Sequence, residues 1–129
     1  MAKTARELSQ EALRSYRPWQ NLLRYQKDPE VDRRCDRAWD VARRAAGLLK
    51  ERFGALKVVA FGSLVCRAWF TPWSDVDLAV WGIPTDKFYR AVGAVQDLGA
   101  EAGFEIDVVD PAECHQAMLQ NIQTEGIEL

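Results

Sequence analysis

The sequence predicts an α/β domain: a small mixed β-sheet of three to four strands, flanked by helices and preceded by an N-terminal helical extension. Short apolar runs rich in β-branched and aromatic residues end at glycine or proline signals, which is typical of buried strands. Segments with apolar residues every three or four positions separate these runs, and this alternation is the pattern of an α/β fold. The 129 residues have the length of one domain, with an extension over residues 1–29 and a core over residues 30–129.

The extension is expected to begin with a short helix. Thr4-Ala-Arg-Glu7 has the spacing of a capping box, in which two side chains satisfy exposed backbone N–H groups. This helix is expected to end near Tyr16, because proline at position 18 disfavours helical geometry in the residue before it. No chemical role follows from the first 30 residues.

A long amphipathic helix is predicted from Asp28-Pro29 to Gly54. Aspartate is a favoured N-cap, proline is favoured at the first helical position, and glycine readily takes the left-handed conformation that ends a helix. Apolar residues recur between these ends at spacings of three and four: Val31, Cys35, Ala38, Ala42, Ala45, Leu49 and Phe53. The opposite face carries a row of basic residues: Arg33, Arg34, Arg37, Arg43, Arg44 and Lys50.

Two strands follow the long helix. Leu56–Phe61 is apolar and β-branched, and it ends in the turn Gly62-Ser63. Leu64–Trp69 is expected to form one or two helical turns, and Ser74–Trp81 the second strand.

The C-terminal part continues the alternation. Thr85 or Asp86 is expected to cap a helix whose end is marked by Gly99 and Gly103, and the third strand is predicted over Phe104–Val109.

A last helix is predicted to follow Asp110-Pro111, which repeats the earlier helix-start signal, and to end at Gly126. His115 lacks the spacing of a metal site and is interpreted as a structural residue at or near the surface.

Charge is unevenly distributed along the chain. Residues 1–53 contain 13 Lys and Arg against 8 Asp and Glu, a net +5, whereas residues 54–129 contain 4 against 11, a net −7. The acidic half suits divalent cations, and the basic half is either the solvated face of helices or a surface for an acidic partner or nucleic acid. Three scattered cysteines indicate reduced thiols, and neither a signal peptide nor a membrane span is predicted. We therefore expect a cytoplasmic protein that does not bind membranes.

Three aspartates are the candidate metal ligands and catalytic residues. Side chains alternate along a strand, so Asp75 and Asp77 are expected to share one face, about 6.5 Å apart along the chain. Asp107 lies on the third strand, opposite its core-facing neighbours, and joins the pair if that strand lies beside the second. Burying such carboxylates is costly without a counter-charge. Three acidic ligands together with phosphate oxygens are what a two-metal phosphoryl or nucleotidyl transfer site requires.

Gly62 and Ser63 are the candidate phosphate ligands. Glycine lets a phosphate approach the backbone, and N–H groups that begin a helix stabilise anions. The Ser63 hydroxyl is suited to donating to a phosphate oxygen, to capping the following helix, or to both. Arg67 is a further candidate for the nucleotide site, and Trp69 and Trp73 either stack on a base or pack against the protein.

Taken together, these segments resemble the minimal nucleotidyltransferases of the DNA polymerase β superfamily. The matching residues are Val59-Ala-Phe-Gly62-Ser63, Ser74-Asp75-Val-Asp77-Leu78 and Phe104-Glu-Ile-Asp107-Val-Val-Asp110. The resemblance covers roughly residues 37–129, and Ile122-Gln-Thr-Glu-Gly126-Ile is similar to the usual tail of that family. It implies a polymerase β-like nucleotidyltransferase fold.

The resemblance also implies an activity: transfer of AMP from ATP to a tyrosine of a HEPN-type ribonuclease toxin, with the chain acting as antitoxin. Gly62 and Ser63 would hold the triphosphate, Asp75 and Asp77 would bind two Mg²⁺ ions, and Asp107 would bind one ion and help deprotonate the acceptor hydroxyl. A binding module that masks its partner without catalysis stays open, as does transfer to a small molecule such as an aminoglycoside. Direct nucleic-acid binding is not expected, and homo-oligomerisation stays open.

The connection between the turn and the first aspartate departs from the family pattern. Eleven residues, Leu64 to Ser74, separate Ser63 from Asp75, where ten are usual. Cys66-Arg67-Ala68 lacks the glycine that usually follows this arginine. We therefore expect the helix on the phosphate side of the site to have a different shape.

Overall fold

The computed structural model describes residues 24–129, so the helix expected near the N-terminus lies outside the described range. Its centre is a four-stranded mixed sheet with the order β3-β2-β1-β4. The strands are β1 (Lys57–Phe61), β2 (Val76–Trp81), β3 (Ile106–Val109) and β4 (Ile127–Glu128). β1 pairs antiparallel with β2 and β4, whereas β2 and β3 run parallel. The predicted mixed sheet of three to four strands is confirmed.

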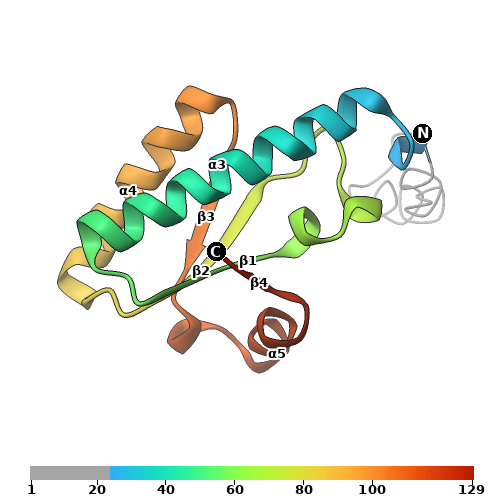
Figure 1. The fold of residues 1–129 in the computed structure, drawn as a ribbon. Helices are drawn as coiled ribbons and strands as arrows, with labels where there is room; N and C mark the ends of the chain where they lie inside the picture. The colour runs from blue at the N-terminus through green and yellow to red at the C-terminus, as the bar shows by residue number, and fades with distance from the viewer. Residues whose placement is uncertain (1–23) are drawn as a thin grey trace, which may run out of the picture.

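Helices cover both faces of this sheet (Figure 1). α3 (Pro29–Phe53) and α4 (Thr85–Ala102) lie on one face, and α5 (Gln116–Glu125) lies on the other. Short 3₁₀ helices occupy the connections: η1 (Gly62–Val65), η2 (Arg67–Trp69) and η3 (Pro111–Glu113). None of the helices within residues 24–129 combines the length and apolarity needed to cross a lipid bilayer.

The long helix α3 begins and ends at the predicted residues. The Asp28 carboxylate accepts a hydrogen bond from the Glu30 N–H at 2.9 Å, and Gly54 takes the left-handed conformation with φ 73°. Both ends therefore satisfy backbone groups that a bare helix terminus leaves without partners. The basic face is exposed as expected, except that Arg34 is half-buried.

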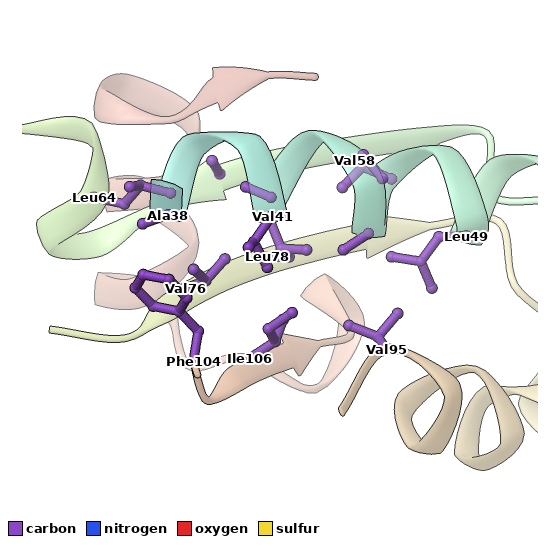
Figure 2. Close-up of a cluster of buried hydrophobic side chains, with 14 of the residues drawn as sticks. Ala38, Val41, Leu49, Val58, Leu64, Val76, Leu78, Val95, Phe104 and Ile106 are labelled. Carbon is purple, nitrogen blue, oxygen red and sulfur yellow. The ribbon is translucent and has the colours of Figure 1, made fainter. Parts of the chain in front are cut away.

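The alternation of side chains along the strands divides the apolar residues between two layers. The larger layer lies between the sheet and the helices α3 and α4 (Figure 2). It includes the fully buried Leu49, Val58, Val76, Leu78, Val95 and Ile106. A smaller layer beneath α5 contains Val59, Phe61, Ala79 and Ile122. Full burial of one such aliphatic side chain contributes roughly 1.5–3 kcal/mol to the free energy of folding. The two layers therefore fix the positions of β2 and β3, which carry Asp77 and Asp107.

Helix α4 begins and ends differently from the prediction. Pro84 occupies the N-cap position without a side-chain hydrogen bond, so the prediction that Thr85 or Asp86 caps the helix is wrong. Gly99 lies inside the helix rather than at its end. Glycine is needed there because a Cβ would approach the Phe104 carbonyl oxygen to 2.6 Å. Gly103 ends the helix in the left-handed conformation.

The last helix begins later than predicted. Asp110-Pro111 starts the short η3 instead, with the Asp110 carboxylate accepting from the Ala112 N–H at 2.9 Å. α5 begins after His115, whose Nδ1 accepts from the Met118 N–H at 3.2 Å. The histidine is thus an exposed N-cap, in agreement with a structural role.

Candidate active site

The parallel pairing of β2 and β3 brings two of the three predicted acidic residues together. Asp77 and Asp107 are register partners, so the two carboxyl groups come from adjacent strands at the same level. Their neighbours Val76 and Ile106 are buried under α3 and α4, which leaves the carboxyl groups on the opposite face of the sheet. The expectation that the third strand lies beside the second is confirmed.

Burial and the neighbouring carboxyl groups raise the proton affinity of Asp77. Its pKa is raised from 3.8 to about 6, first because burial disfavours the ionised form. The negative charges of Asp107 and Asp75 raise it further. Such a carboxyl group is stabilised in the folded protein when it binds a cation or when it takes up a proton near neutral pH.

Asp75 stands immediately before β2 rather than within it, because the strand begins at Val76 and not at Ser74 as predicted. The segment that carries it is tied to α3 through Arg34, whose Nη2 donates to the Ser74 carbonyl oxygen at 3.1 Å. The same guanidinium lies 4.3 Å from the centre of the Phe104 ring, just ahead of β3. Arg34 therefore links the beginnings of both acid-bearing strands.

Burial also acts on Arg34. It lowers the pKa of the guanidinium, the charge of Arg37 lowers it further, and the nearby Asp75 carboxylate opposes both effects. The sequence predicted Arg34 only on the basic face of α3, opposite the apolar stripe. Its spacing of three residues from Val31 and four from Ala38 puts it at the border of the apolar stripe. This spacing could have predicted that the Arg34 side chain is partly buried.

The glycine turn lies directly against the acidic pair. Gly62 has φ 77°, a left-handed conformation that side chains disfavour, and a Cβ there would lie 2.5 Å from Asp77 Oδ2. The close approach follows from the pairing of Phe61 with Asp77 in the β1–β2 ladder. The predicted phosphate turn therefore lies against Asp77, one of the predicted metal ligands, and Ser63 is the next residue of the turn.

A pocket of about 500 Å³ opens beside this turn, between η1–η2 and helix α5. It is lined by Gly62, Ser63, Val65, Cys66, Trp69, Asn121 and Glu125. Of the two tryptophans considered for stacking, only Trp69 belongs to this lining; Trp73 instead makes an edge-to-face contact with Tyr25, with ring centres 5.8 Å apart. Asn121 and Glu125 were not predicted to line this pocket, although their spacing of four residues puts both on one face of a helix.

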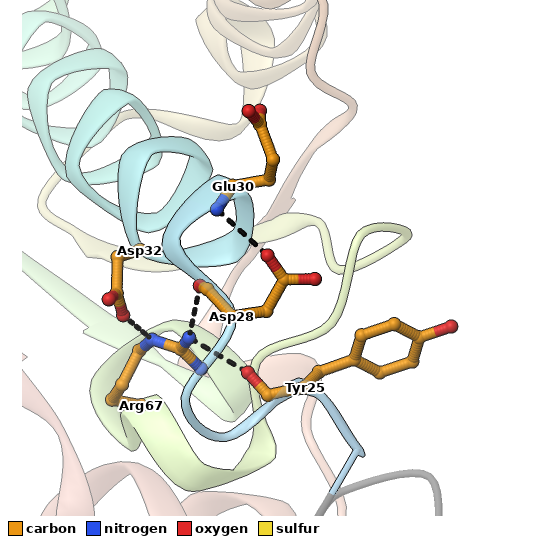
Figure 3. Close-up of polar contacts among 5 residues, drawn as sticks. All are labelled: Tyr25, Asp28, Glu30, Asp32 and Arg67. Carbon is orange, nitrogen blue, oxygen red and sulfur yellow. Dashed lines mark hydrogen bonds and ion pairs between the residues drawn. The ribbon is translucent and has the colours of Figure 1, made fainter.

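Arg67 does not line this pocket, and its guanidinium is bonded to residues at and before the start of α3 (Figure 3). Its Nε donates to the Asp32 carboxylate at 2.7 Å, and its Nη2 donates to the Tyr25 carbonyl oxygen at 2.9 Å. A longer bond of 3.3 Å reaches the Asp28 carbonyl oxygen. These contacts join η2 to the beginning of α3 and give Arg67 a structural role, while its role toward a nucleotide stays a prediction. The connection contains two 3₁₀ helices, in agreement with the one or two helical turns predicted for Leu64–Trp69.

Known proteins supply a comparison for the fold. No protein-family model and no curated protein matches the chain. A solved structure described as a minimal nucleotidyltransferase superposes with a TM-score of 0.57 and 24% sequence identity, covering 74% of this chain and 95% of that one. A mutant of the toxin–antitoxin MntA-HpeT superposes with a TM-score of 0.51 and 22% identity, covering 67% and 69% of the two chains. The chain has the minimal nucleotidyltransferase fold.

Within this nucleotidyltransferase fold, the acidic residues are suited to a hard divalent cation. Asp77 and Asp107 offer the carboxylate oxygens that Mg²⁺ prefers, and their repulsion is what a bound cation relieves. Among residues 24–129, no three His, Cys, Asp or Glu side chains lie close enough to share one ion. The donor chemistry thus fits an ion held by the pair, and Asp75 would complete the set only after its side chain moves.

Proposed function

We propose that the chain is a magnesium-dependent nucleotidyltransferase that transfers AMP from ATP to a hydroxyl group of a partner protein. One observation carries this proposal: the Gly62 turn abuts the Asp77 carboxylate, which is paired with Asp107. A triphosphate bound along Gly62 and Ser63 would therefore bring its α-phosphate to the acidic pair. Fold similarity alone would leave this chemistry open, because one fold supports several functions.

In the proposed reaction, the acceptor oxygen attacks the α-phosphorus and the bond from this phosphorus to the β-bridging oxygen breaks. Pyrophosphate leaves with the electron pair of that bond, and the hydroxyl proton passes to a carboxylate, for which Asp107 is the candidate. Two Mg²⁺ ions, held by Asp75, Asp77 and Asp107, would supply positive charge to the phosphate oxygens and the leaving group. Ser63 and the backbone of the turn would hold the triphosphate in place.

We further propose that the acceptor is a tyrosine of a HEPN-type ribonuclease toxin, which would make this chain an antitoxin. Three findings support this. The three motifs resemble those of antitoxin nucleotidyltransferases, and one structure of the same fold belongs to a toxin–antitoxin pair. Trp73, beside Asp75, is 73% exposed, and large exposed aromatic side chains are enriched where proteins meet.

The experiment combines the purified chain, ATP and Mg²⁺ with the product of the neighbouring gene. We expect the neighbour to gain the mass of one AMP. A double variant with Asp75→Asn and Asp77→Asn should lose transfer while keeping the fold, and Asp97→Asn, on the exposed surface of α4, is the matched control. Full neutralisation of the neighbour without a mass increase would refute transfer and favour masking. Transfer retained in the double variant would show that the metal ligands lie elsewhere.

A further inference from the structure

A second pocket of about 500 Å³ opens beside Asp107, along strand β3. Its lining comes from the second half of α4 and from the chain that leads into β3: Gln96, Ala100, Gly103, Phe104, Glu105, Ile106 and Asp107. Asp107 therefore belongs both to the acidic pair and to this pocket, which we call the β3 pocket. The chemistry at Asp77 and Asp107 does not by itself assign an occupant to it.

The order of the strands places the β3 pocket opposite the phosphate turn. Phe61, directly before the turn, pairs with Asp77 across β1 and β2, and Asp77 pairs with Asp107 across β2 and β3. The turn, Asp77, Asp107 and the β3 pocket therefore follow one another across the sheet. In phosphoryl transfer the attacking and leaving oxygens lie roughly in line, on opposite sides of the phosphorus. With the leaving pyrophosphate along the turn, the acceptor oxygen approaches from the side of β3.

The β3 pocket carries negative charge. Glu105 and Asp107 are both exposed, and the lining contains neither lysine nor arginine. Arg34 lies over the Phe104 ring but outside the lining, and the charge of Asp75 acts on this guanidinium. Helix α4 ends beside the pocket without a basic residue in its last turn, so the partial negative charge of the helix C-terminus adds to that of the carboxylates. Such a pocket attracts cationic side chains and repels phosphate groups.

The β3 pocket also lies along an open edge of the sheet. β3 is the last strand in the order β3-β2-β1-β4, and within residues 24–129 no strand pairs with its outer edge. The Glu105 carbonyl oxygen accepts from the Val76 N–H at 3.0 Å, so the backbone groups of the next residue, Ile106, point to the outer edge. Unpaired backbone groups of an edge strand bind a further peptide chain. The edge therefore favours a peptide over a nucleoside as the occupant.

We propose that the β3 pocket binds the segment of the acceptor protein that carries the reactive hydroxyl, and that a lysine or arginine stands next to the hydroxyl residue. The basic side chain meets Glu105 with its aliphatic stem over Ala100, and the hydroxyl lies at Asp107, in line with the leaving pyrophosphate. This assignment rests on the proposed function for the transfer itself. It adds the surface and the charge by which the acceptor is recognised.

Two substitutions test the β3 pocket without changing the acidic pair. Glu105→Lys reverses its charge, and Ala100→Trp fills it from an exposed position of α4. Each is expected to raise the KM for the product of the neighbouring gene about tenfold or more, because repulsion or lost volume excludes the acceptor segment. Neither should weaken the binding of ATP with Mg²⁺, measured by titration calorimetry, more than about threefold, since the acceptor side alone is changed.

Asp86→Lys is the matched control for the charge reversal. It makes the same change on the exposed surface of α4, about 20 Å from Ala100 along the helix axis at 1.5 Å per residue. This separation exceeds the Debye length of about 8 Å at physiological salt, so the KM for the partner should stay within about threefold of the wild type.

A charge swap gives a second readout. Mass spectrometry of the modified partner locates the acceptor residue, and the lysine or arginine next to it is then replaced by glutamate. This partner variant should bind the wild-type chain weakly and Glu105→Lys with restored affinity, which a merely structural effect of either substitution would not produce. An acceptor residue without a basic neighbour, or a swap that restores nothing, would overturn the proposal.

Failure of this inference is distinguishable from failure of the proposed function. A complex with the partner that weakens in Glu105→Lys, while the wild type transfers no AMP, contradicts the transferase and leaves the docking surface standing. Transfer with the wild-type KM for the partner in both variants contradicts the docking surface and leaves the transferase standing. Loss of ATP affinity in Ala100→Trp, with its circular dichroism intact, assigns the β3 pocket to the nucleotide and likewise overturns the proposal.

Discussion

Replacing Asp77 with asparagine is expected to stabilise the metal-free protein, and the gain is expected to depend on pH. In the folded chain the pKa of Asp77 is raised from 3.8 to about 6 by burial and by the charges of Asp107 and Asp75. At about 1.36 kcal/mol for each pKa unit, ionising this carboxyl in the folded state costs at most about 3 kcal/mol. Because the side chain is only partly buried, screening by solvent reduces this to about 1–2 kcal/mol.

The sign follows from which state binds the proton more tightly. Between pH 3.8 and about 6 the folded protein holds a proton on Asp77 that the unfolded chain has lost, so stability falls as pH rises through this window. Above it the full penalty is present. Asp77→Asn, which cannot ionise, should therefore be more stable than the wild type by about 1–2 kcal/mol at pH 7.5 and nearly equal to it at pH 4.

The assay is urea unfolding with a chelator at pH 4, 5, 6 and 7.5, monitored by circular dichroism. Asp97→Asn is the control, since it removes an exposed carboxylate of α4 away from the cluster, and its stability should follow the wild type at every pH. Adding Mg²⁺ should stabilise the wild type more than Asp77→Asn, because ligands stabilise the state that binds them. An Asp77→Asn variant that is less stable than the wild type at pH 7.5, or a difference that is the same at pH 4, would refute the reasoning.

Three further predictions concern neighbouring contacts. Arg67→Ala should destabilise the chain by about 1–3 kcal/mol, because the carbonyl oxygens of Tyr25 and Asp28 lose their donor; thermal unfolding measures the loss, and an unchanged melting temperature would contradict it. Asp107→Asn should lower the pKa of Asp77 by removing a repelling charge, so the carboxyl carbon resonance of Asp77 should titrate at lower pH than in the wild type. Gly126→Ala should cost about 1–3 kcal/mol, because the new methyl group would clash with the Ile122 carbonyl oxygen and the Val59 side chain; stability equal to the wild type would show that α5 shifts freely.

The sequence alone determined the elements whose signals are local. Asp28-Pro29 and Gly54 bound α3 because capping depends on the residues at each end, and these interactions reach only a few residues along the chain. The strands β1 to β3 were predicted to within two residues because apolar runs between turn signals define them. Capping at α4 and the start of α5 were less predictable, since proline and aspartate signals also begin 3₁₀ turns.

The tertiary structure decided how the predicted residues meet. Whether Asp107 joins Asp77 depends on the parallel register of β2 and β3, and register is a property of pairing between segments far apart in the chain. The contact of Gly62 with Asp77 depends likewise on the β1–β2 ladder. No local pattern shows whether Arg67 binds a phosphate or links η2 to α3. Its hydrogen-bond acceptors, on Asp32 and Tyr25, lie more than thirty residues away along the chain. The three aspartates and the glycine turn were therefore readable from the sequence as candidates, whereas the contacts among them and the charges around them arise only when distant segments pack together.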